Sequence, residues 1–328
     1  MSLSSLVRQK GEFRDRLAAF AKPSINFPQE LVVEQSGCDP SLIGTAYDYL
    51  VRMKMERLLP EDKVRAGDWT ALKAIRNAFK DRGLIPFDDY LWHTYEIGYI
   101  MCTELVGARK LFFEYLTGDE EEVSDDLVAA AYSLACCDAY YRSGSPHPLI
   151  GEDAPREAIQ ELTALLNNTP FEKFTCNDIC HLNPTFDFAG EAVGGADADL
   201  VLDGLLIDLK TSAKRSFRVE DWRQLLAYVL LSRIEANLSE GDYPVQEIGV
   251  YFARFGILEI WNLFDVVDPD EFDEFCKWGT RFVLNAGIQN AHTEKSMVDI
   301  REVHLINKIA ELTGDPKVSW ATRNKISS

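Results

Sequence analysis

The chain has 328 residues, of which 46% are hydrophobic. This content is enough to build a hydrophobic core, so we expect a folded chain and not a disordered one. A formal net charge of −19 excludes binding of nucleic acid through overall charge, but not through a local basic groove. The longest strongly apolar run, residues 127–137, is shorter than the roughly 20 residues of a spanning helix. The seven cysteines are an odd number and are not spaced like a disulfide framework, which suits a reducing compartment. We therefore expect a cytoplasmic protein without a membrane segment.

Apolar residues at helical spacing predict a mostly helical region over residues 1–165. A helix over residues 41–59 ends before Pro60, and the next one has a stop signal at Gly83. The segment 143–148 contains Gly and Pro and predicts a loop. The other helical stretches of this region are 90–116, 124–141 and 154–168.

The pattern changes near residue 170, where we expect a core over residues 166–265. Residues 186–212 alternate like strands around an Asp-Gly turn, a helix is predicted at 219–235, and residues 247–263 alternate again around Gly256. From Pro269 the pattern returns to helix, which predicts a helical extension over residues 266–328. This order of elements favours an α/β or α+β fold with helical additions.

A hairpin over residues 197–210 is the most informative part of the chain, because Asp203-Gly204 is a two-residue turn signal between apolar strands. The turn predicts that Asp199 lies opposite Asp208. Since side chains alternate with period 2, one face then carries Asp197, Asp199, Asp208 and Lys210. The other face carries Ala198, Leu200, Ile207 and Leu209 and can belong to a core.

Opposed carboxylates on a sheet repel each other unless a cation lies between them. Oxygen ligands of this type suit Mg²⁺ or Mn²⁺. A lysine beside the metal can orient a water or stabilise developing negative charge, so the face predicts metal-assisted hydrolysis of a phosphodiester. The alternative is an ordinary solvated strand face with a cross-strand salt bridge between Asp197 and Lys210.

Residues 199–211 (DLVLDGLLIDLKT) resemble the core signature of the PD-(D/E)XK nuclease superfamily, an acid followed on the next strand by acid-x-lysine. Asp199 matches the first acid, with Asp197 as a competitor, and Asp208 and Lys210 match the second element. The pair Gln224 and Tyr228 matches the QxxxY motif of the RecB/Cas4-like branch and lies on one helix face.

Residues 44–48 (GTAYD) resemble the GTxxH element of the same branch, with Asp48 in place of the histidine. The resemblance covers residues 41–59 and 183–263. It implies an α/β restriction-endonuclease-like core with a mixed central sheet, to which helix 41–59 contributes, and a Mg²⁺- or Mn²⁺-dependent nuclease acting on DNA rather than RNA.

In the implied site, Asp199 and Asp208 hold the metal, Lys210 positions the attacking water, and Gln224 and Tyr228 orient the site or the substrate strand. Further metal ligands implied by the resemblance are the Leu209 carbonyl, Asp48, which can still ligate a cation, and the upstream Glu191. The alternative for Glu191 is a surface strand residue.

A basic cluster follows the lysine strand and suits contacts to phosphates; its candidate substrate-binding residues are Lys214, Arg215, Arg218 and Arg223. The alternative is a solvated helix start paired with Glu220 and Asp221. Only Cys276 follows the QxxxY motif, so we expect no iron–sulfur cluster.

Two other functions stay open. One is a catalytically silent nuclease-like fold that binds nucleic acid or acts as a scaffold in a larger complex. The other is an acidic surface that binds a protein partner which delivers the nucleic acid.

Overall fold

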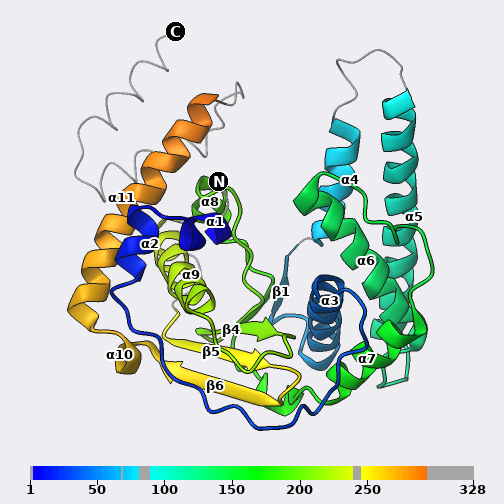
Figure 1. Cartoon of the computed structure of the whole chain (residues 1–328), viewed down its shortest axis with the longest axis horizontal. Helices are drawn as coiled ribbons and strands as arrows, with labels where there is room; N and C mark the ends of the chain where they lie inside the picture. The colour runs from blue at the N-terminus through cyan, green and yellow to red at the C-terminus, as the bar shows by residue number, and fades with distance from the viewer. Residues whose placement is uncertain (1–2, 68, 81–88, 239–244, 294–328) are drawn as a thin grey trace.

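The computed structural model describes residues 3–67, 69–80, 89–238 and 245–293 (Figure 1). Within these residues, six strands form one mixed sheet in the order β1-β2-β3-β4-β5-β6. Pairs β1/β2 and β4/β5 are parallel and the other neighbours are antiparallel. The strands are β1 Val64–Ala66, β2 Cys180–Leu182, β3 Leu200–Leu202, β4 Leu205–Lys210, β5 Glu247–Phe252 and β6 Ile257–Asn262. The chain is therefore an α/β protein.

Helices cover both faces of this sheet. In Figure 1, α9 with α1, α2, α8 and α11 lies on one side, and α3 to α7 lie on the other. The helices are α1 Leu3–Arg8, α2 Glu12–Leu17, α3 Pro40–Leu58, α4 Thr70–Lys80, α5 Asp89–Thr117, α6 Asp125–Ser143, α7 Arg156–Asn167, α8 Asp187–Ala192, α9 Val219–Leu238, α10 Leu263–Val266 and α11 Pro269–Thr293, with a 3₁₀ turn at Phe171–Lys173.

The two sheet faces build two hydrophobic cores. Leu200 and Ile207 belong to the core beside α3, whereas Val201 and Leu206 belong to the core beside α9. This is the period-2 alternation expected of strands. One face of β4 therefore packs toward α9, which is the crossover helix between the parallel strands β4 and β5.

The predicted hairpin register is confirmed, with Leu200 paired to Ile207 and Leu202 to Leu205. Asp203 and Gly204 both have positive φ, 48° and 91°, as the tight hairpin turn requires. The Asp203 carboxylate also accepts hydrogen bonds from three successive backbone amides, those of Asn177, Asp178 and Ile179. The turn is thereby fixed to the segment before β2.

Helix α3 agrees with the predicted helix 41–59. Its N-terminus is capped by Asp39, whose carboxylate accepts a hydrogen bond of 2.8 Å from the Ser41 amide, and Pro40 occupies the first turn. The helix ends at Leu58, and Leu59, before Pro60, is extended. Helices α4 to α7, α9 and α11 also agree with the predicted stretches, although the stop at Gly83 and residues 294–328 of the predicted extension lie outside the described residues.

Two expectations about the segment before β3 were wrong. Residues 187–192, predicted as strand, form α8, whose small residues Ala189, Gly190 and Ala192 are buried. A Cβ on Gly190 would lie 1.9 Å from the Thr185 carbonyl oxygen, so close packing selects glycine there. Ala198 packs in the core beside α9 and not with Leu200, because β3 begins only at Leu200.

The region 1–165 is not only helical and does not belong to one side of the sheet. It contributes the short parallel strand β1, which pairs with β2. Helices α1 and α2 pack against α9 on the opposite side from α3. A three-residue edge strand is too short to show alternation in the sequence. Among the described helices, none is both long and apolar enough to span a bilayer.

Candidate active site

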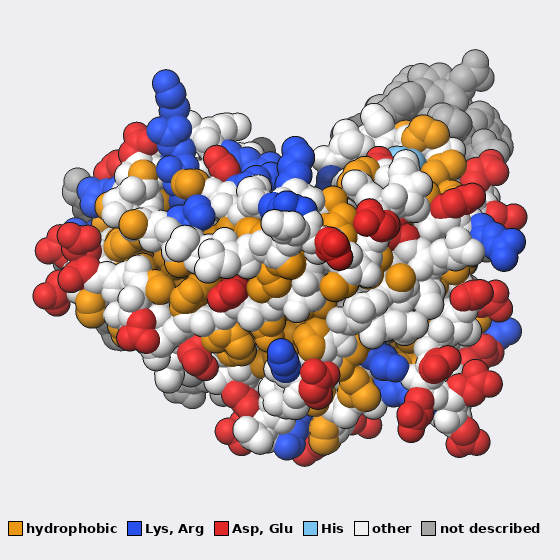
Figure 2. Space-filling view, turned by 60° about the horizontal axis from the view of Figure 1, so that its bottom comes forward, with side chains coloured by type: hydrophobic (Ala, Val, Ile, Leu, Met, Phe, Trp, Pro, Cys, Tyr) orange, Lys and Arg blue, Asp and Glu red, His pale blue; other side chains and the backbone are white. Residues whose placement is uncertain are grey.

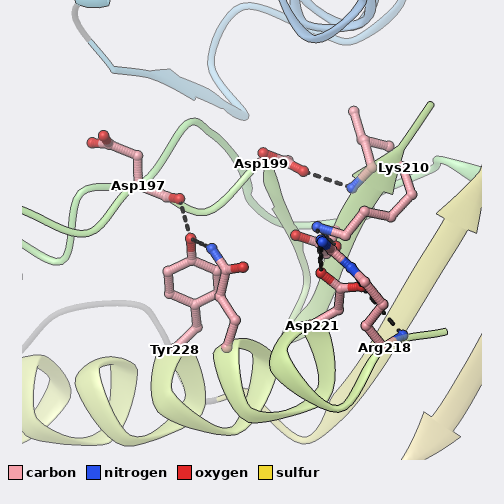
Figure 3. A network of polar contacts seen from close by, with 9 residues as sticks. Asp197, Asp199, Lys210, Arg218, Asp221 and Tyr228 are labelled. Carbon is pink, nitrogen blue, oxygen red and sulfur yellow. Dashed lines mark hydrogen bonds and ion pairs between the residues drawn. The ribbon is translucent and has the colours of Figure 1, made fainter. Parts of the chain in front are cut away.

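Charged and polar side chains meet where β4 and the segment before β3 face helix α9 (Figure 3). Asp208 and Lys210 come from β4, and Asp199 immediately precedes β3. From α9 come Asp221, Gln224 and Tyr228, spaced i, i+3 and i+7 and therefore on one helix face. The hairpin and the crossover helix thus bring together five of the predicted residues, Asp199, Asp208, Lys210, Gln224 and Tyr228.

The Asp199 carboxylate accepts a hydrogen bond of 2.6 Å from the Leu209 amide, which holds it against β4. Burial, followed by the charges of Asp48 and Asp208, raises the pKa of Asp199 well above its usual range. Asp199 is therefore close enough to Asp48 and to Asp208 to be repelled by each of them. Leu209 lies between Asp208 and Lys210 and is half-buried.

Asp197 lies apart from this group. Its carboxylate is 3.6 Å from Lys73 Nζ of α4, and in Figure 3 it points away from Asp199. The alternative of a salt bridge between Asp197 and Lys210 is therefore wrong, because the chain leaves the strand register before it reaches Asp197. Of the two candidates for the first acid, Asp199 is the one whose carboxylate contacts β4, through the Leu209 amide.

Lys210 lies between two carboxylates. Its Nζ is 2.6 Å from Asp208 Oδ2 and 3.7 Å from Asp221 Oδ1. Burial opposes charge on this ammonium, but Asp208, Asp221 and Asp199 outweigh it and raise the pKa of Lys210. Burial also raises the pKa of Asp208, against the lowering effect of Lys210. The lysine is thus held as a cation beside the acids.

Gln224 and Tyr228 face the cluster, as predicted. Gln224 Nε2 donates to Tyr228 Oη at 2.7 Å, and Tyr228 Oη donates to the Asp197 carbonyl oxygen at 2.5 Å. Burial, followed by the charges of Asp199 and Asp208, raises the pKa of Tyr228 well above its usual range. The motif ties the segment before β3 to α9.

Asp48, on α3, approaches the site from the other side. Its Oδ2 is 2.7 Å from Arg52 Nη2, one turn later on the helix, whereas its buried Oδ1 has no hydrogen-bond partner. Burial raises the pKa of Asp48, against the lowering effect of Arg52. A Cβ on Gly44 would lie 3.1 Å from Thr211 Oγ1, so α3 closely approaches the end of β4.

The donor set suits a divalent cation. Asp48, Asp199 and Asp208 supply carboxylate oxygens, and Asp48 Oδ1 is buried without a hydrogen-bond partner. A cation would relieve the repulsion of Asp199 by the other two acids. As they stand in the described part of the chain, no three carboxylate, histidine or cysteine side chains form a ready-made metal cluster. Asp208 is occupied by Lys210, and Asp199 by the Leu209 amide.

Glu191 does not join this group. It is exposed and lies on α8, not on a strand. The polar contacts of Asp199 and Asp208 are made with the Leu209 amide and with Lys210. The predicted role of Glu191 as a metal ligand therefore has no support in the arrangement of the described residues.

The basic cluster divides into two kinds of residue. Lys214 and Arg215 are exposed in the segment between β4 and α9. Arg218 is 54% exposed, and its guanidinium binds Asp221 through two hydrogen bonds. Arg223 is half-buried, with its Nε buried and unpartnered. Figure 2 shows Lys and Arg side chains gathered near the middle of its upper edge, with Asp and Glu on both flanks.

Arg52 and Lys73, which lie around the site, were not predicted from the sequence, and Asp221 was expected only as an ion-pair partner of the basic helix start. Asp221 precedes Gln224 by three positions and Arg52 follows Asp48 by four, so helical spacing could have identified both. Lys73 comes from α4 and reaches Asp197 across a separation of more than a hundred residues, which no local pattern reveals.

Comparisons with protein-family models, with curated proteins and with solved structures found no match to this chain.

Proposed function

We propose that this chain is a Mg²⁺-dependent nuclease with a PD-(D/E)XK core of the RecB/Cas4-like branch, which hydrolyses phosphodiester bonds in DNA. The observation that carries the proposal is the convergence of Asp199, Asp208 and Lys210 on the α9 face of the hairpin. The Gln224–Tyr228 pair on the facing helix supports it further.

In this proposal Asp199, Asp208 and Asp48 hold the cation, together with the Leu209 carbonyl. When bound, Mg²⁺ or Mn²⁺ would act as a Lewis acid toward the phosphoryl oxygens and would lower the pKa of a bound water. The Lys210 ammonium orients the attacking water and stabilises the negative charge that develops on the phosphate. Lys214, Arg215 and Arg218 contact neighbouring phosphates of the strand.

The direct test is incubation with single- and double-stranded DNA and RNA, linear and circular, in Mg²⁺, Mn²⁺ or EDTA. We expect cleavage of DNA with either metal and none in EDTA. Lys210→Met should retain metal binding and lose about 10²–10³ in rate. The exposed Lys277 of α11 offers a matched control, because Lys277→Met removes the same charge far from the cluster. Equal rates for Lys210→Met and wild type at saturating Mg²⁺ would contradict the proposed role.

One observation favours the second candidate, a catalytically silent nuclease-like module. Asp208 and Asp48 each have an internal cation partner, Lys210 and Arg52, so the cluster has compensation without a metal. Calorimetry separates the two functions. The nuclease should bind Mg²⁺ and should lose this binding in Asp199→Asn. A silent module should show no Mg²⁺ binding that depends on Asp199.

A further inference from the structure

Asp221 is a buried acid that contacts two cations of the site. It lies in the first turn of α9, and its side chain is 5% exposed. Its Oδ1 accepts a hydrogen bond of 2.7 Å from Arg218 Nη2 and is 3.7 Å from Lys210 Nζ. Its Oδ2 accepts a bond of 2.9 Å from Arg218 Nε and one of 3.3 Å from the Arg218 amide. A single carboxylate thus links the strand lysine to a half-exposed arginine.

Helix capping explains only part of this arrangement. An acid near the start of a helix that accepts a hydrogen bond from an upstream backbone amide is one half of a capping box. Capping does not require contact with Lys210 of β4, and it does not require that the same acid hold the Arg218 guanidinium. The two ion pairs therefore need a further reason.

Competition for Asp208 supplies that reason. Asp208 is the nearest counter-ion of Lys210, but in the proposed nuclease Asp208 also holds the cation. A lysine held by Asp208 alone would lose its anchor once that carboxylate turned to the metal. Its ammonium ends a flexible four-carbon stem and needs a fixed acceptor to keep one position. Asp221 is not among the proposed metal ligands and remains available.

We propose that Asp221 is a positioning residue of this site, which keeps the Lys210 ammonium in place when Asp208 binds the cation and holds Arg218 toward the phosphates of the substrate strand. This inference rests on the proposed nuclease function. Asp221 itself touches neither metal nor substrate. It acts through the two cations that it binds.

The test compares Asp221→Asn, which removes the charge, with Asp221→Glu, which keeps the charge and the capping acceptor. Asp273→Asn is the control, because the exposed Asp273 binds Arg233, an arginine within α9, at 3.0 Å. The first readout needs no substrate. NMR on protein carrying ¹³Cε-lysine follows the titration of Lys210, whose signal is assigned by its loss in Lys210→Met.

We expect the pKa of Lys210 to be lower in Asp221→Asn than in wild type, since a nearby opposite charge is lost. Asp221→Glu should largely restore it, and Asp273→Asn should leave it unchanged. Cleavage of DNA at saturating Mg²⁺ should fall about tenfold or more in Asp221→Asn, and the alkaline limb of its pH profile should move to lower pH. A helix cap alone would change thermal stability without moving either the lysine titration or the pH profile.

An unchanged Lys210 titration in Asp221→Asn would overturn the inference, as would an altered titration with wild-type cleavage. A wild type that cleaves no nucleic acid would overturn the proposed function, while the titration would still decide whether Asp221 controls Lys210. If Asp221→Asn alone does not fold, the double variant Asp221→Asn with Arg218→Gln removes both charges of the ion pair and carries the same titration test.

Discussion

Tyr228 donates its hydroxyl hydrogen to the carbonyl oxygen of Asp197, two residues before Asp199, and so fixes the path of the chain into β3. Tyr228→Phe removes this bond and keeps the ring, which stacks on Phe186 at 5.6 Å. We expect a stability loss of about 1 kcal/mol and weaker Mg²⁺ binding, measured by urea unfolding and calorimetry. Tyr251→Phe is the control, because Tyr251 Oη donates to the Asn168 carbonyl oxygen at 3.0 Å. Equal effects of both variants on metal affinity would refute a specific role for Tyr228.

Asp199→Asn separates stability from function. Burial and the neighbouring charges of Asp48 and Asp208 raise the pKa of Asp199 and disfavour its charged form, so removal of its charge should stabilise the metal-free fold. Asparagine keeps an oxygen acceptor for the Leu209 amide. In EDTA at neutral pH we expect a higher Tm than wild type, by about 2–4 °C for each kcal/mol gained, together with loss of Mg²⁺ binding and cleavage. A lower Tm in EDTA would mean that repulsion is not significant there.

Arg52 is the cation that pairs with Asp48 on the next turn of α3. Its side chain is 6% exposed, binds Asp48 at 2.7 Å and lies over the Tyr49 ring at 4.6 Å. Arg52→Met leaves the half-buried Asp48 carboxylate without its hydrogen-bonded cation and should cost about 1–3 kcal/mol in the free energy of unfolding. The double variant with Asp48→Asn should recover much of this loss. Urea unfolding of the four proteins in this cycle measures the coupling, and additive losses would rule out the compensation.

Asp138 of α6 should make stability depend on pH. Burial raises its pKa from 3.8 to about 7, against the lowering hydrogen bond from Tyr49 Oη. Between these values the folded protein binds more protons than the unfolded chain, so this contribution to stability is present at low pH and is lost as pH rises through the folded value. Each tenfold difference in proton affinity between the folded and unfolded chain corresponds to about 1.4 kcal/mol.

Asp138→Asn keeps an acceptor for Tyr49 and cannot titrate. The difference in Tm between variant and wild type should therefore grow in favour of the variant from pH 4 to pH 7 and level off above it. Calorimetric unfolding in a pH series measures this difference. A constant difference across the series would show that Asp138 does not titrate in this range.

The hairpin could be predicted in detail, because an Asp-Gly turn fixes the register and the register fixes which residues face each other. The pairing of Leu200 with Ile207 follows directly from it. The prediction failed for Asp197, because register arguments hold only while the chain remains paired, and β3 begins at Leu200. Helix α3 could be predicted because Pro60 and helical spacing mark it.

Contacts between distant segments could not be predicted in the same way. The alternating apolar residues of 187–192 looked like a strand, but small residues let this segment pack as a helix against α9 and α11. Similarly, β1 forms only because β2 lies beside it. In both cases tertiary packing overrides a weak local preference.

Helix α9 determines two separate positions of the hairpin, since Tyr228 holds Asp197 and Asp221 holds Lys210. The back of the same helix rests on the first residues of the chain, where Trp222 Nε1 donates to the Phe20 carbonyl oxygen at 3.1 Å and α1 and α2 pack alongside. A change in this N-terminal support would therefore act on the helix that anchors both residues. Residues 3–20 therefore support the position of the cluster through α9, although none of the polar side chains described in the cluster comes from them.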